Sequence, residues 1–192
     1  FIDKNGTAVT NYHVVQGGTS GRVVLANGRE YEVESVLGKD KHSDLVIIKI
    51  DIPKSTPVKL ADSLGVATGD RVYTIGYPES FALGVDPSTF TEGIVSKASY
   101  TVEGVEYIQT NADITHGNSG GVLLNEKGEV IGITTGAINI NGVRYMNLAL
   151  PSNNIKRIDK TEYMIPLEEF TEKVREYTVH FMNGSTECDV RK

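Results

Sequence analysis

The chain has 192 residues, of which 39% are apolar, and a formal net charge of −6 from 19 Lys and Arg against 25 Asp and Glu. This composition predicts a globular protein with a packed core, and the scattered basic residues exclude the positive surface that nucleic-acid binding requires. No apolar run approaches the roughly 20 residues of a membrane-spanning helix. The single cysteine, Cys188, excludes an internal disulfide and zinc sites of the CxxC type.

Short runs rich in Val, Ile, Thr and Tyr alternate with turn dipeptides along most of the chain, which predicts an all-β fold class. We expect six strands in a first lobe, at residues 1–3, 7–12, 21–26, 29–37, 45–50 and 58–60. After a polar linker at 61–69, we expect six more in a second lobe, at residues 71–76, 89–98, 105–110, 121–125, 130–135 and 143–150. Asn-Gly and Lys-Gly dipeptides predict hairpin turns at 5–6, 27–28, 127–128 and 141–142. Two six-stranded β-barrels packed together would place a functional site in the crevice between them.

The pattern changes after Pro151. Four apolar residues recur at helical spacing behind a proline and predict a short C-terminal helix: Leu167, Phe170, Val174 and Tyr177. A strand is expected at 177–182, followed by an Asn-Gly turn and a charged end without a partner strand in this chain.

The most informative string is GNSGG at 117–121, which lies between two predicted strands. Small residues on both sides of Ser119 leave its hydroxyl group accessible and allow the N–H groups of Gly117 and Ser119 to face one point, where they can bind an oxyanion. Asn, Ser and Gly are also ordinary turn residues, so the string alone does not separate a catalytic loop from a simple turn.

A serine hydroxyl group becomes a strong nucleophile only when a base accepts its proton, so the hypothesis requires a histidine and a carboxylate that orients it. His13 follows a predicted strand of the first lobe, and Asp44 directly precedes another. Each alone is explained as a strand-end or turn residue. Together with Ser119 they give the order His, Asp, Ser.

The chain resembles the trypsin-like serine proteases, and within them the HtrA/Deg branch. The resemblance covers about residues 1–158 and is carried by VTNYHVV at 9–15, GKDKHSDLVIIKI at 38–50, IGYP at 75–78, EGIVS at 92–96, IQTNADITHGNSGGVLLNEKGEVIGITT at 108–135 and LALPSN at 148–153. It implies a chymotrypsin-like double β-barrel and an ATP-independent serine endopeptidase that acts on unfolded or flexible protein segments.

The resemblance also implies roles for individual residues. His13 would be the general base, Asp44 would orient it, and Ser119 would form an acyl-enzyme. The backbone of Gly117 and Ser119, with Asn118 as a third candidate, would form the oxyanion hole.

The specificity pocket implied by the resemblance consists of two segments, Asp113, Ile114, Thr115 and His116 before the nucleophile and Ile133, Thr134, Thr135 and Gly136 after it. Asp113 lies six residues before Ser119, the spacing at which a carboxylate in trypsin itself selects Lys or Arg. Ile114 stands where HtrA relatives have an aliphatic pocket residue. A carboxylate buried without a basic ligand costs free energy, and we therefore expect cleavage after small or aliphatic residues.

By this interpretation residues 1–158 form the protease domain, with lobes at 1–60 and 70–150 joined by the linker at 61–69. Residues 159–192 form an extension that does not resemble the start of a PDZ domain. The resemblance further implies an extended polypeptide substrate, an extracytoplasmic location (periplasmic, cell-envelope or secreted), and a homo-oligomer formed through a segment that would precede Phe1. No cofactor is expected, and no ligand spacing supports a zinc site built from His13, His42 and His116.

Two other functions compete with this one. The same fold can serve as a catalytically silent peptide-binding module, because folds host more than one function. The chain can also be interpreted as a structural or adhesive β module whose last strand begins a repeat array. His13, Asp44 and Ser119 together favour the protease.

Overall fold

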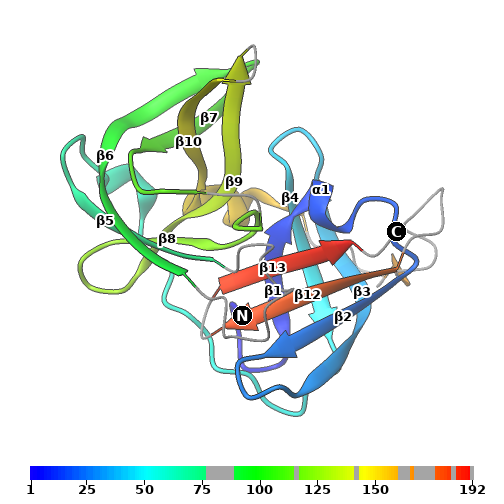
Figure 1. Cartoon of the computed structure of the whole chain (residues 1–192). Helices are drawn as coiled ribbons and strands as arrows, with labels where there is room; N and C mark the ends of the chain where they lie inside the picture. The colour runs from blue at the N-terminus through cyan, green and yellow to red at the C-terminus, as the bar shows by residue number, and fades with distance from the viewer. Residues whose placement is uncertain are drawn as a thin grey trace.

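The computed structural model describes residues 1–76, 89–114, 117–140, 143–159, 165–166, 176–182 and 185–190. These residues form two β lobes that lie against each other, with little helix (Figure 1). The predicted all-β, two-lobed fold class is confirmed. Within the described ranges, no helix is both long and apolar enough to cross a membrane.

The second lobe is a closed barrel of six strands in the order β10-β7-β6-β5-β8-β9. Its strands are β5 (Arg71–Gly76), β6 (Thr89–Val102), β7 (Val105–Thr110), β8 (Val122–Leu124), β9 (Val130–Ile140) and β10 (Val143–Pro151). Short 3₁₀ helices flank it, one within the linker (Ser63–Gly65) and one after β10 (Ser152–Arg157). Each of the six strands predicted for this lobe is present, because their alternating pattern has the period of a half-buried strand.

The first lobe is a seven-stranded sheet with the order β1-β4-β3-β2-β12-β13, and β11 pairs with β3. Its strands are β1 (Thr7–Asn11), β2 (Ser20–Leu25), β3 (Glu30–Asp40), β4 (Leu45–Ile50), β11 (Ile165–Pro166), β12 (Glu176–Met182) and β13 (Ser185–Val190). A single turn of α-helix, α1 (Tyr12–Val15), follows β1 directly.

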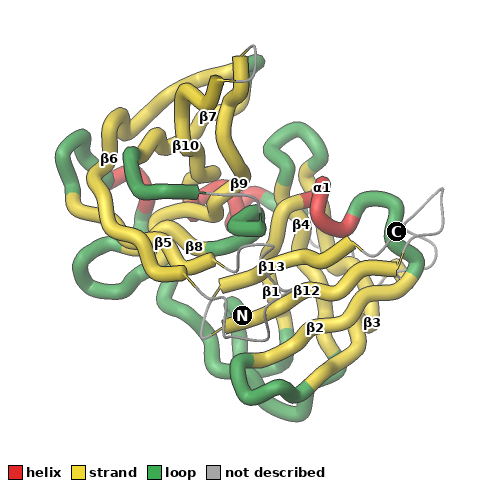
Figure 2. The backbone as a smooth tube through the Cα atoms, viewed as in Figure 1, coloured by secondary structure: helices red, strands yellow, loops and turns green. Residues whose placement is uncertain are grey.

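This lobe differs from the predicted six-stranded barrel. Residues 1–3 and 58–60 form no named strand, although Leu60 makes one parallel bridge to Val130. The expectation that the C-terminal strand has no partner was wrong, because β12 pairs in parallel with β2 and antiparallel with β13 (Figure 2). A strand edge such as that of β2 presents N–H and C=O groups that can form hydrogen bonds with another extended segment. In this structure that segment is β12. The helix predicted over 167–177 falls mostly outside the described residues, and Tyr177 itself lies in β12.

Strand β4 is buried on both faces, and its residues alternate between two hydrophobic cores. Val46, Ile48 and Ile50 pack into the first lobe. Leu45 and Ile47 pack instead with second-lobe residues, including Val122, Ile133 and Leu150. A separate cluster around Val72, Ile108 and Leu123 fills the second barrel. Because Asp44 directly precedes β4, this shared core fixes the position of Asp44 at the junction of the lobes.

The predicted turns at Gly6, Gly28 and Gly128 all have positive φ, at 83°, 77° and 70°. Glycine adopts this backbone conformation without steric cost, which explains the dipeptides that predicted these turns. The fourth predicted turn, at 141–142, lies outside the described residues.

Candidate active site

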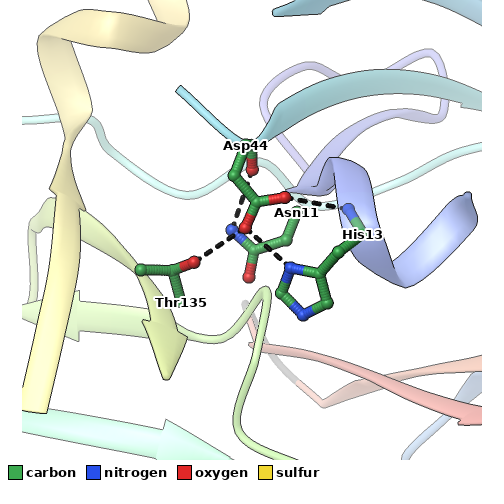
Figure 3. A network of polar contacts seen from close by, with 4 residues as sticks. All are labelled: Asn11, His13, Asp44 and Thr135. Atoms are coloured by element: carbon green, nitrogen blue, oxygen red, sulfur yellow. Dashed lines mark hydrogen bonds and ion pairs between the residues drawn. The ribbon is translucent and has the colours of Figure 1, made fainter. Parts of the chain in front are cut away.

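His13 and Asp44 are paired through two hydrogen bonds (Figure 3). The backbone N–H of His13 donates to Asp44 Oδ1 at 2.8 Å, and His13 Nδ1 lies 2.6 Å from Asp44 Oδ2. A carboxylate can only accept, so the ring proton lies on Nδ1 and the other ring nitrogen is free to accept a proton. That second nitrogen points away from Asp44 in Figure 3, and the imidazole is 47% exposed.

The backbone of Asp44 is held by the segment that carries His13. The N–H of Tyr12 and the side-chain amide of Asn11 both donate to the Asp44 carbonyl oxygen, each at 3.0 Å. Asp44 itself has a φ of +50°, an uncommon conformation for a residue other than glycine. The end of β1 and the start of β4 therefore fix the histidine and the carboxylate relative to each other.

Asp40 stabilises the turn that leads into Asp44. Its carboxylate accepts the N–H groups of His42 at 3.0 Å and Ser43 at 3.1 Å, and also the Ser43 hydroxyl group. Burial acts to raise the pKa of Asp40, but the hydrogen bonds from Ser43 and His42 outweigh it and hold this pKa below its usual value. Asp40 was not among the site residues expected from the sequence, although an Asp followed three positions later by Ser is a recognisable turn signal.

Tyr107 of β7 lies within the electrostatic field of the pair. Burial, followed by the negative charges of Asp44 and Glu103, raises the pKa of this phenol. A tyrosine is already neutral at pH 7, and the raised pKa keeps the Tyr107 phenol protonated to higher pH.

Thr135 connects the pair to the second lobe. Its hydroxyl group, on β9, donates to Asp44 Oδ2 at 2.8 Å (Figure 3). Thr135 was expected to line the specificity pocket, whereas in the structure its hydroxyl group binds Asp44. The carboxylate is thus held by groups from both lobes.

We expect Thr135→Val to lower kcat/KM by about tenfold, because a hydrogen bond to a charged group contributes on the order of 1.5–3 kcal/mol. Thr135→Ser keeps the hydroxyl group and should stay close to the wild type. Steady-state hydrolysis of a peptide ester by both variants measures this. Equal losses in the two variants would show that packing, rather than the hydrogen bond, is responsible.

The GNSGG loop is hydrogen-bonded to Thr134, the residue of β9 that precedes Thr135. The N–H of Gly120 donates to the Thr134 carbonyl at 2.8 Å, and the N–H of Thr134 donates to the Gly121 carbonyl at 3.0 Å. Gly117 and Gly120 have φ values of +93° and +81°, which explains the glycines in the string. Two consecutive residues of β9 thus have different partners, because Thr135 binds Asp44 and Thr134 binds the Ser119 loop.

Ser119 is half-buried in this loop. Within the ranges that the structure describes, no hydrogen bond joins it to His13, whose own hydrogen bonds go to Asp44. The structure therefore brings His13 and Asp44 into direct contact and connects Ser119 to them through β9.

The Asn118 side chain points into the protein rather than into the site. It is 2% exposed and fills the space beside Gly76, where an added Cβ atom would lie 2.0 Å from Asn118 Oδ1. Of the predicted oxyanion group, Asn118 can therefore contribute only its backbone.

Asp113 does not lie at the floor of a buried pocket. This residue is exposed, and its carbonyl oxygen accepts the hydroxyl groups of Thr74 at 3.3 Å and Thr91 at 3.0 Å. The Ile114 side chain is fully buried, and Ile133 belongs to the core shared by the lobes. Gly136 has a φ of +127°. Thr115 and His116 lie outside the described residues.

No group of three or more His, Cys, Asp or Glu residues that could hold a metal ion occurs in the described part of the chain. His42 lies apart from the pair, near the β6–β7 turn, where an added Cβ atom on Gly104 would be 3.5 Å from its Nε2.

Comparison with known proteins identifies the family of this chain. Residues 1–133 match the model of the trypsin-like peptidase domain. The chain belongs to the trypsin-like peptidase family. Within this family it falls in the HtrA/Deg branch, as predicted, because its relatives carry those names.

The periplasmic serine endoprotease DegP of Salmonella typhimurium is 43% identical over 159 residues, which are 80% of this chain and 32% of DegP. The serine protease Do-like HtrA of Bacillus subtilis is 39% identical over 170 residues, which are 82% of this chain and 37% of that protein. This trypsin-like peptidase chain thus spans about a third of the length of these relatives.

Solved structures of the HtrA-type protease AlgW have the same fold. AlgW with a tripeptide aligns with a TM-score of 0.70 at 33% identity, over 82% of this chain and 52% of AlgW. AlgW with a decapeptide aligns with a TM-score of 0.69 at the same identity, over 82% of this chain and 49% of AlgW.

Proposed function

We propose that this chain is a serine endopeptidase that hydrolyses peptide bonds in unfolded or flexible protein segments, with His13, Asp44 and Ser119 as its catalytic triad. The observation that carries the proposal is the Asp44 carboxylate, which binds His13 from one lobe and Thr135 from the other. Thr135 directly follows Thr134, which is hydrogen-bonded to the Ser119 loop. The names of the relatives support the same activity.

In the proposed reaction, His13 Nε2 takes the hydroxyl proton of Ser119 while Ser119 Oγ attacks the carbonyl carbon of the scissile bond. Asp44 keeps the remaining ring proton on Nδ1 and stabilises the imidazolium. Backbone N–H groups of Gly117 and Ser119 stabilise the tetrahedral oxyanion. His13 then gives its proton to the leaving amine, which leaves an acyl-enzyme, and water hydrolyses this ester through the same groups in reverse.

The proposed substrate is an extended polypeptide, because an extended chain can bind to a β protein by pairing as an added strand. The peptides in the AlgW structures support this class of ligand. The periplasmic location in the names of several relatives supports an extracytoplasmic location. Assembly into a homo-oligomer stays a prediction. The relatives give no support to the catalytically silent alternative.

The experiment compares two states of one test protein, its native form and its reduced, permanently unfolded form. The proposal expects peptide-bond cleavage of the unfolded form at a much higher rate, detected as new N-termini by mass spectrometry. An absence of cleavage in both forms, with a correctly folded enzyme, would overturn the proposed function.

We further expect cleavage after small or aliphatic residues. The exposed position of Asp113 supports this preference over a trypsin-like one, because a surface carboxylate is screened by solvent and selects a basic side chain weakly. A peptide-library digest by the wild type and by Asp113→Ala tests it. Dominant cleavage after Lys or Arg that is lost in Asp113→Ala would reverse the assignment.

A further inference from the structure

Thr134 makes three hydrogen bonds with the loop that carries Ser119. Its backbone N–H and C=O bind Gly121 and Gly120, as described above. Its hydroxyl group donates to the Asn118 carbonyl oxygen, and that oxygen also accepts the N–H of Gly121 at 3.0 Å. Thr134 is fully buried, so no water competes for these contacts.

We propose that the Thr134 hydroxyl group is a positioning group for the oxyanion hole, because it fixes the orientation of the peptide unit between Asn118 and Ser119. This inference rests on the proposed function. It adds to that function a residue that contacts neither the substrate nor the nucleophilic oxygen.

The geometry of one peptide bond connects Thr134 to the oxyanion hole. The carbonyl of Asn118 and the N–H of Ser119 belong to the same planar unit, and no cis peptide bond occurs in the described residues. In a trans peptide the C=O and N–H bonds point in opposite directions. Two donors that hold the carbonyl oxygen on the β9 side therefore direct the Ser119 N–H to the opposite side, where the proposed oxyanion forms.

Two neighbouring features restrict this peptide further. The Asn118 side chain is confined to the space beside Gly76. At Gly121, an added Cβ atom would lie 2.9 Å from the Asn118 carbonyl oxygen and 3.0 Å from Thr134 Oγ1. The second glycine of the GG pair therefore leaves room for the hydrogen bond between Thr134 and Asn118.

This role predicts a specific kinetic signature. An oxyanion donor is stronger in the transition state than in the ground state, so a misdirected N–H lowers kcat and leaves substrate binding nearly unchanged. A residue that only stabilises the fold would lower the melting temperature without this separation of kcat from KM.

The experiment uses Thr134→Val, which keeps the shape but removes the hydroxyl group, and Thr134→Ser, which keeps the hydroxyl group. Thr134→Ala serves as a second hydroxyl-free variant. Each is compared with the wild type for kcat and KM on a short peptide ester, for inhibition by a peptide aldehyde that forms a tetrahedral adduct, and for the melting temperature.

We expect Thr134→Val to lower kcat by about 10- to 100-fold with KM within about twofold, since loss of one oxyanion donor costs on the order of 10²–10³ in kcat. The aldehyde affinity should fall in proportion to kcat, and Thr134→Ser should restore both. A folded Thr134→Val or Thr134→Ala enzyme with wild-type kcat, or equal losses in the serine variant, would overturn the inference. A folded wild-type protein without hydrolytic activity would instead overturn the proposed function, and with it the basis for a positioning role.

Discussion

Ser119→Ala should abolish peptide-bond hydrolysis, with a fall in kcat on the order of 10⁶-fold, because no other group on the loop can form the acyl-enzyme. Loss of the nucleophile exceeds the effect of any single positioning change in this site. The small residual rate over water would come from the oxyanion donors and from substrate binding alone. The measurement is cleavage of an unfolded protein substrate at high enzyme concentration.

The matched control is Ser96→Ala, which removes a hydroxyl group from an exposed position on β6. It should retain wild-type activity, and both variants should keep the wild-type melting temperature within a few degrees. Turnover by Ser119→Ala at a rate near that of the control would show that another residue is the nucleophile.

Asp44→Asn should lower kcat by about 10⁴-fold, the loss known for the same change in a related protease. The present geometry gives the reason. Asp44 Oδ2 accepts from both His13 Nδ1 and the Thr135 hydroxyl group. An amide nitrogen at that position donates instead, so it stabilises the histidine tautomer with its proton on Nε2, which cannot accept the serine proton.

Asp51→Asn, at an exposed aspartate after β4, is the control for a general change of charge. Because Asp44 follows a constrained turn, the melting temperature of Asp44→Asn is measured alongside. If the variant folds and retains more than about a tenth of the wild-type kcat, Asp44 does not orient the base in the way proposed here.

The parts of the fold that the sequence predicts well depend on local patterns. The six strands of the second lobe follow from alternation of apolar and polar residues, and Gly6, Gly28 and Gly128 mark turns that need positive φ. For these features, the neighbours in sequence determine the conformation. The contact between His13 and Asp44 joins residues far apart in the sequence, and it was expected only from the family resemblance.

Pairing between distant strands was not accessible in the same way. The contact of β12 with β2 joins residues 176–181 to residues 20–25, and no local pattern states which open edge a late strand will occupy. The sequence showed that 177–182 is extended, but it did not identify the partner of that strand.

The roles of Thr134 and Thr135 illustrate the same limit within the site. Both residues were predicted near the nucleophile, as parts of a pocket wall. Successive residues of a strand point to opposite faces, and the two hydroxyl groups consequently reach different partners, Asn118 and Asp44. The partner of Thr135 depends on the docking of the two lobes, and the partner of Thr134 depends on how the Ser119 loop folds against β9. Both are properties of the tertiary structure.

Labelling with a fluorophosphonate probe shows directly whether His13 activates Ser119. The probe phosphonylates a serine only when a neighbouring base has made it nucleophilic. Tryptic mapping by mass spectrometry should place the adduct on Ser119 in the wild type, and His13→Ala should show none at the same probe concentration. Failure of the folded wild-type protein to react, or equal labelling in His13→Ala, would show that His13 does not activate Ser119.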